Sequence, residues 1–121
     1  MTIQELLESM KNEGGANPGP MELLSQLDES AVFEHANNRK WIFSKTAIPA
    51  NYKMLMSIAV AAALGESNCI KTYVRGAKQK GVSKDEIAEA LMLARFVKAT
   101  TVFSASVDAM RYLVEVAPKD N

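Results

Sequence analysis

The side chain with the clearest chemical potential is Cys69, the only cysteine among 121 residues. Gly65 interrupts the chain, and the following residues favour a new helix that begins at Glu66 or Ser67. Cys69 then lies in the first helical turn, where unpaired backbone N–H groups and the helix dipole favour the thiolate over the thiol. Because the thiolate is the nucleophile, this position predicts a reactive cysteine. The alternative is that Cys69 packs as a small apolar residue, as lone cysteines commonly do.

Two polar residues are expected beside Cys69. Tyr73 follows it by one helical turn on the same face, so its hydroxyl can hydrogen-bond to the thiolate or to a ligand. A tyrosine hydroxyl keeps its proton at neutral pH and is therefore a poor general base. Glu66 precedes the cysteine by less than a turn, and a nearby carboxylate disfavours the thiolate. We expect both residues to shape a pocket around the sulfur.

His35 is the only histidine and hence the only ready proton shuttle near pH 7. Its neighbours Glu34, Asn37 and Asn38 are typical of a surface helix, which favours a solvent-exposed histidine. It is retained as a supporting candidate that could serve Cys69 within one chain or across subunits. One histidine and one cysteine cannot build a metal site without carboxylates or a second subunit, and we predict no metal and no cofactor.

Composition excludes several classes of partner. Lysine plus arginine and aspartate plus glutamate both number 14, which removes the electrostatic argument for binding nucleic acid or an anionic membrane. The N-terminus lacks the pattern of a signal peptide, and the longest apolar stretch, residues 54–64, is too short to span a bilayer. We therefore expect a single cytoplasmic domain over residues 1–121. Zero net charge also favours self-association.

Hydrophobic spacing is helical throughout and predicts an all-α bundle of about six to seven helices. Capping-box spacings join Thr2 to Glu5 and Ser83 to Glu86. Ser30 is expected to cap a third helix. These elements must position the candidate residues, because no strand pattern interrupts them.

Three later segments are predicted to be buried, one all round and two along an apolar stripe. In the helix expected at residues 49–64 the run from Met54 to Leu64 is apolar on every side, which indicates burial all round, either inside a bundle or between subunits. The helix that begins after Ser83 and a last helix over about 101–116 carry inward-facing stripes. The residues of these stripes are Ile87, Leu91 and Ala94 in the first, and Phe103, Val107, Met110 and Val114 in the second.

One segment is similar to a known family. It reads Val74-Arg75-Gly76-Ala77 and then Gly81-Val82-Ser83-Lys84-Asp85-Glu86-Ile87, after an alanine-rich helix and a short break. This pattern resembles the carboxymuconolactone decarboxylase and alkylhydroperoxidase D-like proteins, and the likeness extends over about residues 50–112. The resemblance implies an alkylhydroperoxidase D-like helical bundle that assembles as a homo-oligomer, a trimer or hexamer.

The resemblance also bears on the site. The family's peroxidase branch uses Cys-x-x-Cys-x-x-x-His with a glutamate on the preceding helix. This sequence keeps the second cysteine as Cys69, whereas Glu66 stands at the first cysteine, Tyr73 at the histidine and Met54 at the glutamate. An intramolecular disulfide cycle is therefore impossible here, and a redox role must use one cysteine.

Three functions remain open. The first is a thiol-dependent peroxide reductase in which Cys69 is oxidised to a sulfenic acid and reduced by a small thiol, a partner protein or another subunit. The second is a lactone-decarboxylase-like enzyme, which needs Lys53, Arg75 or Arg95 to hold a substrate carboxylate. The third is a non-catalytic protein that binds a small ligand or serves in assembly on the same scaffold.

Overall fold

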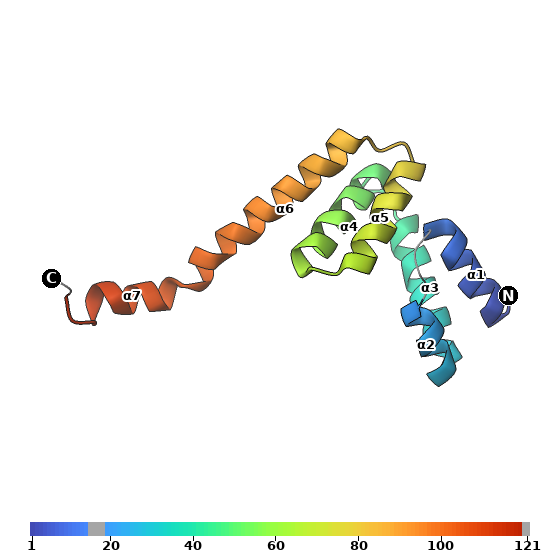
Figure 1. Cartoon of the computed structure of the whole chain (residues 1–121), viewed down its shortest axis with the longest axis horizontal. Coiled ribbons are helices and arrows are strands. Elements are labelled where there is room, and N and C mark those ends of the chain that lie inside the picture. The colour runs from blue at the N-terminus through green and yellow to red at the C-terminus, as the bar shows by residue number, and fades with distance from the viewer. Residues whose placement is uncertain (15–18, 120–121) are drawn as a thin grey trace.

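The computed structural model describes residues 1–14 and 19–119, and the regular structure in them is entirely α-helical (Figure 1). The predicted all-α class and number of helices are confirmed. In chain order the helices are α1 (Ile3–Gly14), α2 (Gly19–Leu27), α3 (Glu29–Ser44), α4 (Ala50–Leu64), α5 (Ser67–Gln79), α6 (Lys84–Ala105) and α7 (Val107–Glu115).

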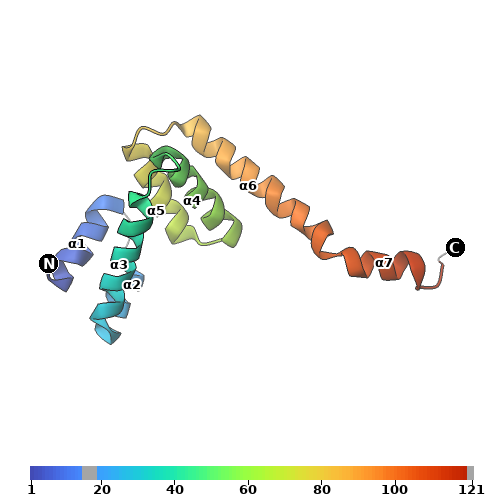
Figure 2. The same ribbon diagram turned by 180° about the vertical axis from the view of Figure 1, so that it is seen from behind.

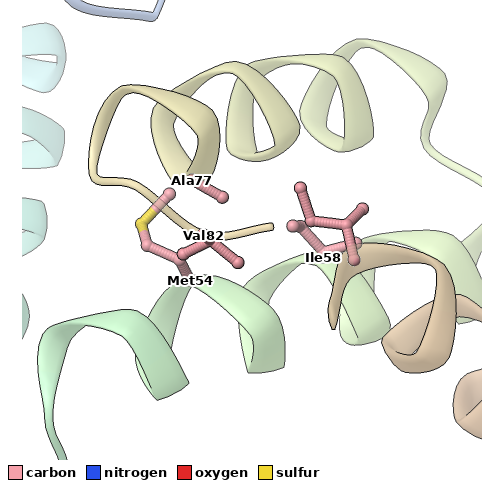
Figure 3. Packing of buried hydrophobic residues seen from close by; sticks show 5 residues of the cluster. Met54, Ile58, Ala77 and Val82 are labelled. Carbon is pink, nitrogen blue, oxygen red and sulfur yellow. The ribbon is translucent and has the colours of Figure 1, made fainter. Parts of the chain in front are cut away.

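The main core lies where α4, α5 and the start of α6 meet. Met54 and Ile58 of α4 are almost completely buried against Ala77 of α5 and Val82 of the following loop (Figure 3). Burying a side chain of this size contributes about 1.5–3 kcal/mol. A Cβ atom added at Gly76 would lie 2.8 Å from the terminal methyl of Met54, so the glycine permits this close packing of α4 on α5.

A second, smaller core joins the N-terminal helices. Ile3 and Leu6 of α1 pack with Val32 of α3, and Met21 and Leu24 of α2 cover the cluster in part. α1, α2 and α3 thereby form a helical group beside the α4–α5 pair (Figures 1 and 2).

Local capping agrees with the sequence in the region of Cys69. Gly65 adopts φ 75°, the left-handed conformation that ends α4, and Glu66 is the N-cap of α5. The predicted break and helix start are confirmed. The predicted cap at Ser30 is wrong, because the carboxylate of Asp28 accepts the Ser30 N–H at 3.0 Å and caps α3. The hydrogen bonds from the Ser30 hydroxyl and N–H lower the pKa of Asp28.

The start of α6 carries the predicted capping box. The Ser83 hydroxyl accepts the Glu86 N–H at 3.0 Å, and the Glu86 carboxylate accepts the Ser83 N–H at 3.0 Å. We expect Ser83→Ala to lower the free energy of unfolding by about 1 kcal/mol, the usual contribution of such a cap. Urea unfolding measures this, with Ser83→Thr as the control that keeps a hydroxyl. Equal stability of the alanine variant and the parent would contradict the assignment.

The same box makes stability depend on pH. The Ser83 N–H, and secondly its hydroxyl, hold the pKa of Glu86 below its ordinary value. A carboxyl group with a lowered folded-state pKa stabilises the fold above its unfolded pKa, and this stabilisation is lost as pH falls through the folded value. In Glu86→Gln the free energy of unfolding should therefore fall less than in the parent as the pH is lowered.

α6 and α7 form a long extension. α6 runs unbroken to Ala105, so the predicted helix start near Thr101 is wrong and the break falls at Ser106. The Lys98 ammonium donates to the Ala63 carbonyl at the end of α4, at 2.7 Å. Beyond this contact residues 99–116, hereafter the arm, lead away from the rest of the chain (Figures 1 and 2). No single described helix is long and apolar enough to cross a membrane, although α6 and α7 together pass that test across a 43° bend.

The arm does not bury the stripe predicted for it. Phe103, Val107, Met110 and Val114 are all exposed. Leu91, predicted to face inward, is 38% exposed as well. The predicted helical period is present, but none of these residues is buried in the described structure.

α4 likewise differs from its prediction. Met54, Ile58 and Ala61 face the core, whereas Met56, Val60 and Leu64 on the other side are exposed. Within one chain the helix is therefore buried on one face only.

Candidate functional site

An apolar pocket of about 530 Å³ lies between the C-terminal end of α3, the outer face of α4 and the start of α5. Three of the residues singled out from the sequence, Cys69, Glu66 and Tyr73, line it together. The remaining lining residues among those described are Ile42, Phe43, Ile48, Lys53, Met56, Ser57, Val60, Ala61 and Leu64.

Cys69 is the third residue of α5 and is half-buried. Glu66 accepts the Asn68 N–H at 3.3 Å, which holds its carboxylate at the helix start beside the cysteine. Cys69 also lines the pocket, so a molecule bound there can reach it. A half-buried cysteine in a pocket lining is better placed to act as a nucleophile than one sealed in the core.

Tyr73 connects the pocket to the core. It lines the pocket one turn after Cys69 and also packs, partly buried, against the cluster around Met54 and Ile58. Residues four apart on a helix are neighbours on its surface. Tyr73 is thus placed to contact a ligand that reaches the sulfur.

Lys53 has a structural task at the pocket edge. Its ammonium donates to the Ile42 carbonyl at 2.9 Å and also to the Lys45 carbonyl. These bonds satisfy the C-terminal end of α3 and fix the start of the loop to α4. Its charge is therefore already engaged by backbone oxygens. Arg75 and Arg95 are exposed and lie outside the pocket lining.

Met54 and His35 lie apart from the pocket. Met54 is 1% exposed and belongs to the core, where its side chain contacts Ala77 and Val82 (Figure 3). His35 is exposed on α3, about two turns before Ile42. The structure thus brings together Cys69, Glu66 and Tyr73 but places neither of the other two candidates in the lining.

The apolar wall of the pocket was missed by sequence reasoning. Met56, Val60 and Leu64 recur every four residues, a spacing that places them on one face of α4. This stripe was hidden in a helix that is apolar on every side. Ile42 and Ile48 come from the end of α3 and the next loop, which only the tertiary fold brings near Cys69.

A depression of about 740 Å³ lies along α1, lined by five polar residues of that helix alone. Over residues 1–14 and 19–119, no three His, Cys, Asp or Glu side chains come together as a metal site would require.

Comparison with known proteins gives two findings. The sequence model of the carboxymuconolactone decarboxylase family matches residues 29–112, which include every residue of the pocket lining. A protein of Paracoccus denitrificans, described as uncharacterized protein 4 in cox locus, is 29% identical over 77 residues. That alignment covers 64% of this chain and 69% of the Paracoccus protein.

Proposed function

We propose, from the premise that this chain belongs to the carboxymuconolactone decarboxylase family, that it is a thiol-dependent reductase of organic peroxides. The observation that carries the proposal is the position of Cys69, in the first turn of α5 and in the lining of an apolar pocket. The pocket gives an apolar substrate access to this cysteine.

The reaction uses one sulfur. The Cys69 thiolate attacks the terminal, hydrogen-bearing oxygen of an organic hydroperoxide, forming an S–O bond while the O–O bond breaks, and the alkoxide that leaves takes a proton from water. The sulfur is oxidised to a sulfenic acid and the peroxide is reduced to an alcohol. An external thiol then forms a mixed disulfide and releases water. A second external thiol displaces Cys69 and leaves as a disulfide.

The pocket wall sets the substrate preference. Met56, Val60 and Leu64 present only apolar atoms to a bound molecule. Each CH₂ group buried there contributes about 0.8 kcal/mol to binding. Alkyl and aryl hydroperoxides should therefore react faster than hydrogen peroxide.

Initial rates of cumene hydroperoxide loss, with dithiothreitol as the reductant, test the proposal. Cys69→Ser should remove consumption above the uncatalysed background, and dimedone should trap the sulfenic acid in the parent. The matched control is Cys69→Ser/Gln79→Cys, which keeps one thiol on α5 but moves it to the other end of the helix. A control as active as the parent, or a parent no faster than Cys69→Ser, would overturn the proposal.

The other two functions predict different results. A binding protein without turnover would leave the peroxide intact while small apolar ligands protect Cys69 from alkylation. A lactone-decarboxylase-like enzyme would act without Cys69 but needs a cation for the substrate carboxylate. The engagement of Lys53 by two backbone carbonyls weighs against that function.

A further inference from the structure

The arm is an amphipathic element whose apolar stripe is left uncovered by the described residues of its own chain. Val107, Met110 and Val114 recur at helical spacing on α7, and Phe103 extends the stripe onto α6. The exposed fractions of Phe103 and Val114 are 72% and 83%. Both views show the arm leading away from the other helices (Figures 1 and 2). A contiguous exposed apolar stripe of this kind marks a surface that another molecule covers.

The Cys69 pocket is open on an equally apolar side. Met56, Val60 and Leu64 form its outer wall, and Leu64 is 78% exposed. The arm of the same chain leads away from this wall. The pocket as one chain builds it therefore lacks a cover over its apolar edge.

The accessible surface of the chain is larger than that of a compact monomer of the same mass. The chain exposes 9182 Å². A compact monomer of 13.2 kDa exposes about 6,400 Å², so the excess is roughly 2,800 Å². A stable interface needs about 800 Å² per partner. The excess thus exceeds what one stable interface requires, and zero net charge does not oppose contact between copies.

We propose that the arm of a second copy packs along the outer face of α4 and closes the pocket over Cys69. The arm stripe from Phe103 to Val114 is about 16 Å long and the wall from Met56 to Leu64 about 12 Å, at 1.5 Å per residue. The arm stripe is therefore long enough to cover the whole wall. Each copy has both an arm and a wall. In a closed symmetric assembly every wall is therefore covered by the arm of another copy, without a different protein.

The consequence is a pocket shared between subunits. Arm residues of the second copy become part of its lining, and the sulfur is shielded from bulky reagents. The polar side of α7, with Asp108, Arg111 and Glu115, remains in water. This inference concerns assembly and access, and it holds whether or not a peroxide is the substrate.

Sedimentation of the full chain tests the assembly. At micromolar concentration the parent should have a sedimentation mass that is a multiple of 13.2 kDa. The double variant Phe103→Glu/Met110→Glu should have the monomer mass of 13.2 kDa, and its helical circular dichroism should be unchanged. A bulky maleimide should then label Cys69 about tenfold faster, since a covered thiol reacts only when its cover opens. Arg111→Glu, on the polar side, is the control and should match the parent. A monomeric parent, or a double variant with the parent's mass and labelling rate, would overturn the inference.

Cross-linking tests the location. In Met110→Cys, a short bis-maleimide should join the introduced thiol to Cys69 of another chain and give a covalent dimer. Asp108→Cys, on the opposite side of α7, should give little dimer. Adding Cys69→Ser to Met110→Cys should remove the product. A dimer that survives this change would mean that arms pair with arms, which would refute docking at the pocket.

Discussion

Met54→Glu should leave the chain unable to fold stably, although it restores the carboxylate that the family resemblance leads one to expect at this position. Met54 is 1% exposed, and its neighbours Ile58, Ala77 and Val82 provide no polar side-chain partner. Loss of the methionine packing alone costs about 2–5 kcal/mol. Burying a carboxyl group without a hydrogen bond adds several more, against a total stability of about 5–15 kcal/mol.

Urea unfolding followed by circular dichroism measures this effect. Met54→Leu is the control, because a swap that nearly conserves volume costs less than about 1.5 kcal/mol. If Met54→Glu unfolded at the parent's urea midpoint, the site would have to admit water or a partner for the carboxylate. The expected result makes Met54 a packing residue, so the proton relay of the peroxidase branch cannot be restored from α4 by this change alone.

The features predicted correctly from the sequence are those decided by a few neighbouring residues. The Ser83–Glu86 capping box, the helix break at Gly65 and the start of α5 at Glu66 each depend on contacts within about four positions. The placement of Cys69 in the first turn of a helix follows from them. Where two capping residues competed, as Asp28 and Ser30 do, spacing alone did not decide between them.

The errors share a different cause. Periodicity identifies the apolar face of a helix but not what covers it. The stripe through Phe103 and Met110 was predicted correctly as a stripe and incorrectly as buried. The pocket wall was missed for the same reason. Because α4 is apolar on every side, its sequence does not indicate that Met56 and Val60 face outward. Both corrections concern surfaces that the chain does not cover by itself.

Tyr73→His should raise the rate at which Cys69 reacts with an alkyl hydroperoxide by about 10²-fold, the lower end for a positioned general base. Residue 73 lines the pocket one turn after Cys69 on the same face of α5, so an imidazole there is within range of the sulfur. Histidine takes up a proton near neutral pH, which a tyrosine hydroxyl does not. The variant thus supplies the base that this sequence lacks.

Initial rates across pH separate this effect from a change in packing. With histidine the rate should rise with pH through the histidine range near ~6.5, because only the neutral imidazole accepts the thiol proton. Tyr73→Phe is the matched control, since it keeps the ring against the core but cannot exchange a proton. If the histidine and phenylalanine variants reacted equally fast at every pH, the missing base would not limit Cys69. The α5 helix start alone would then account for the reactivity of the sulfur, and Tyr73 would serve only to shape the pocket.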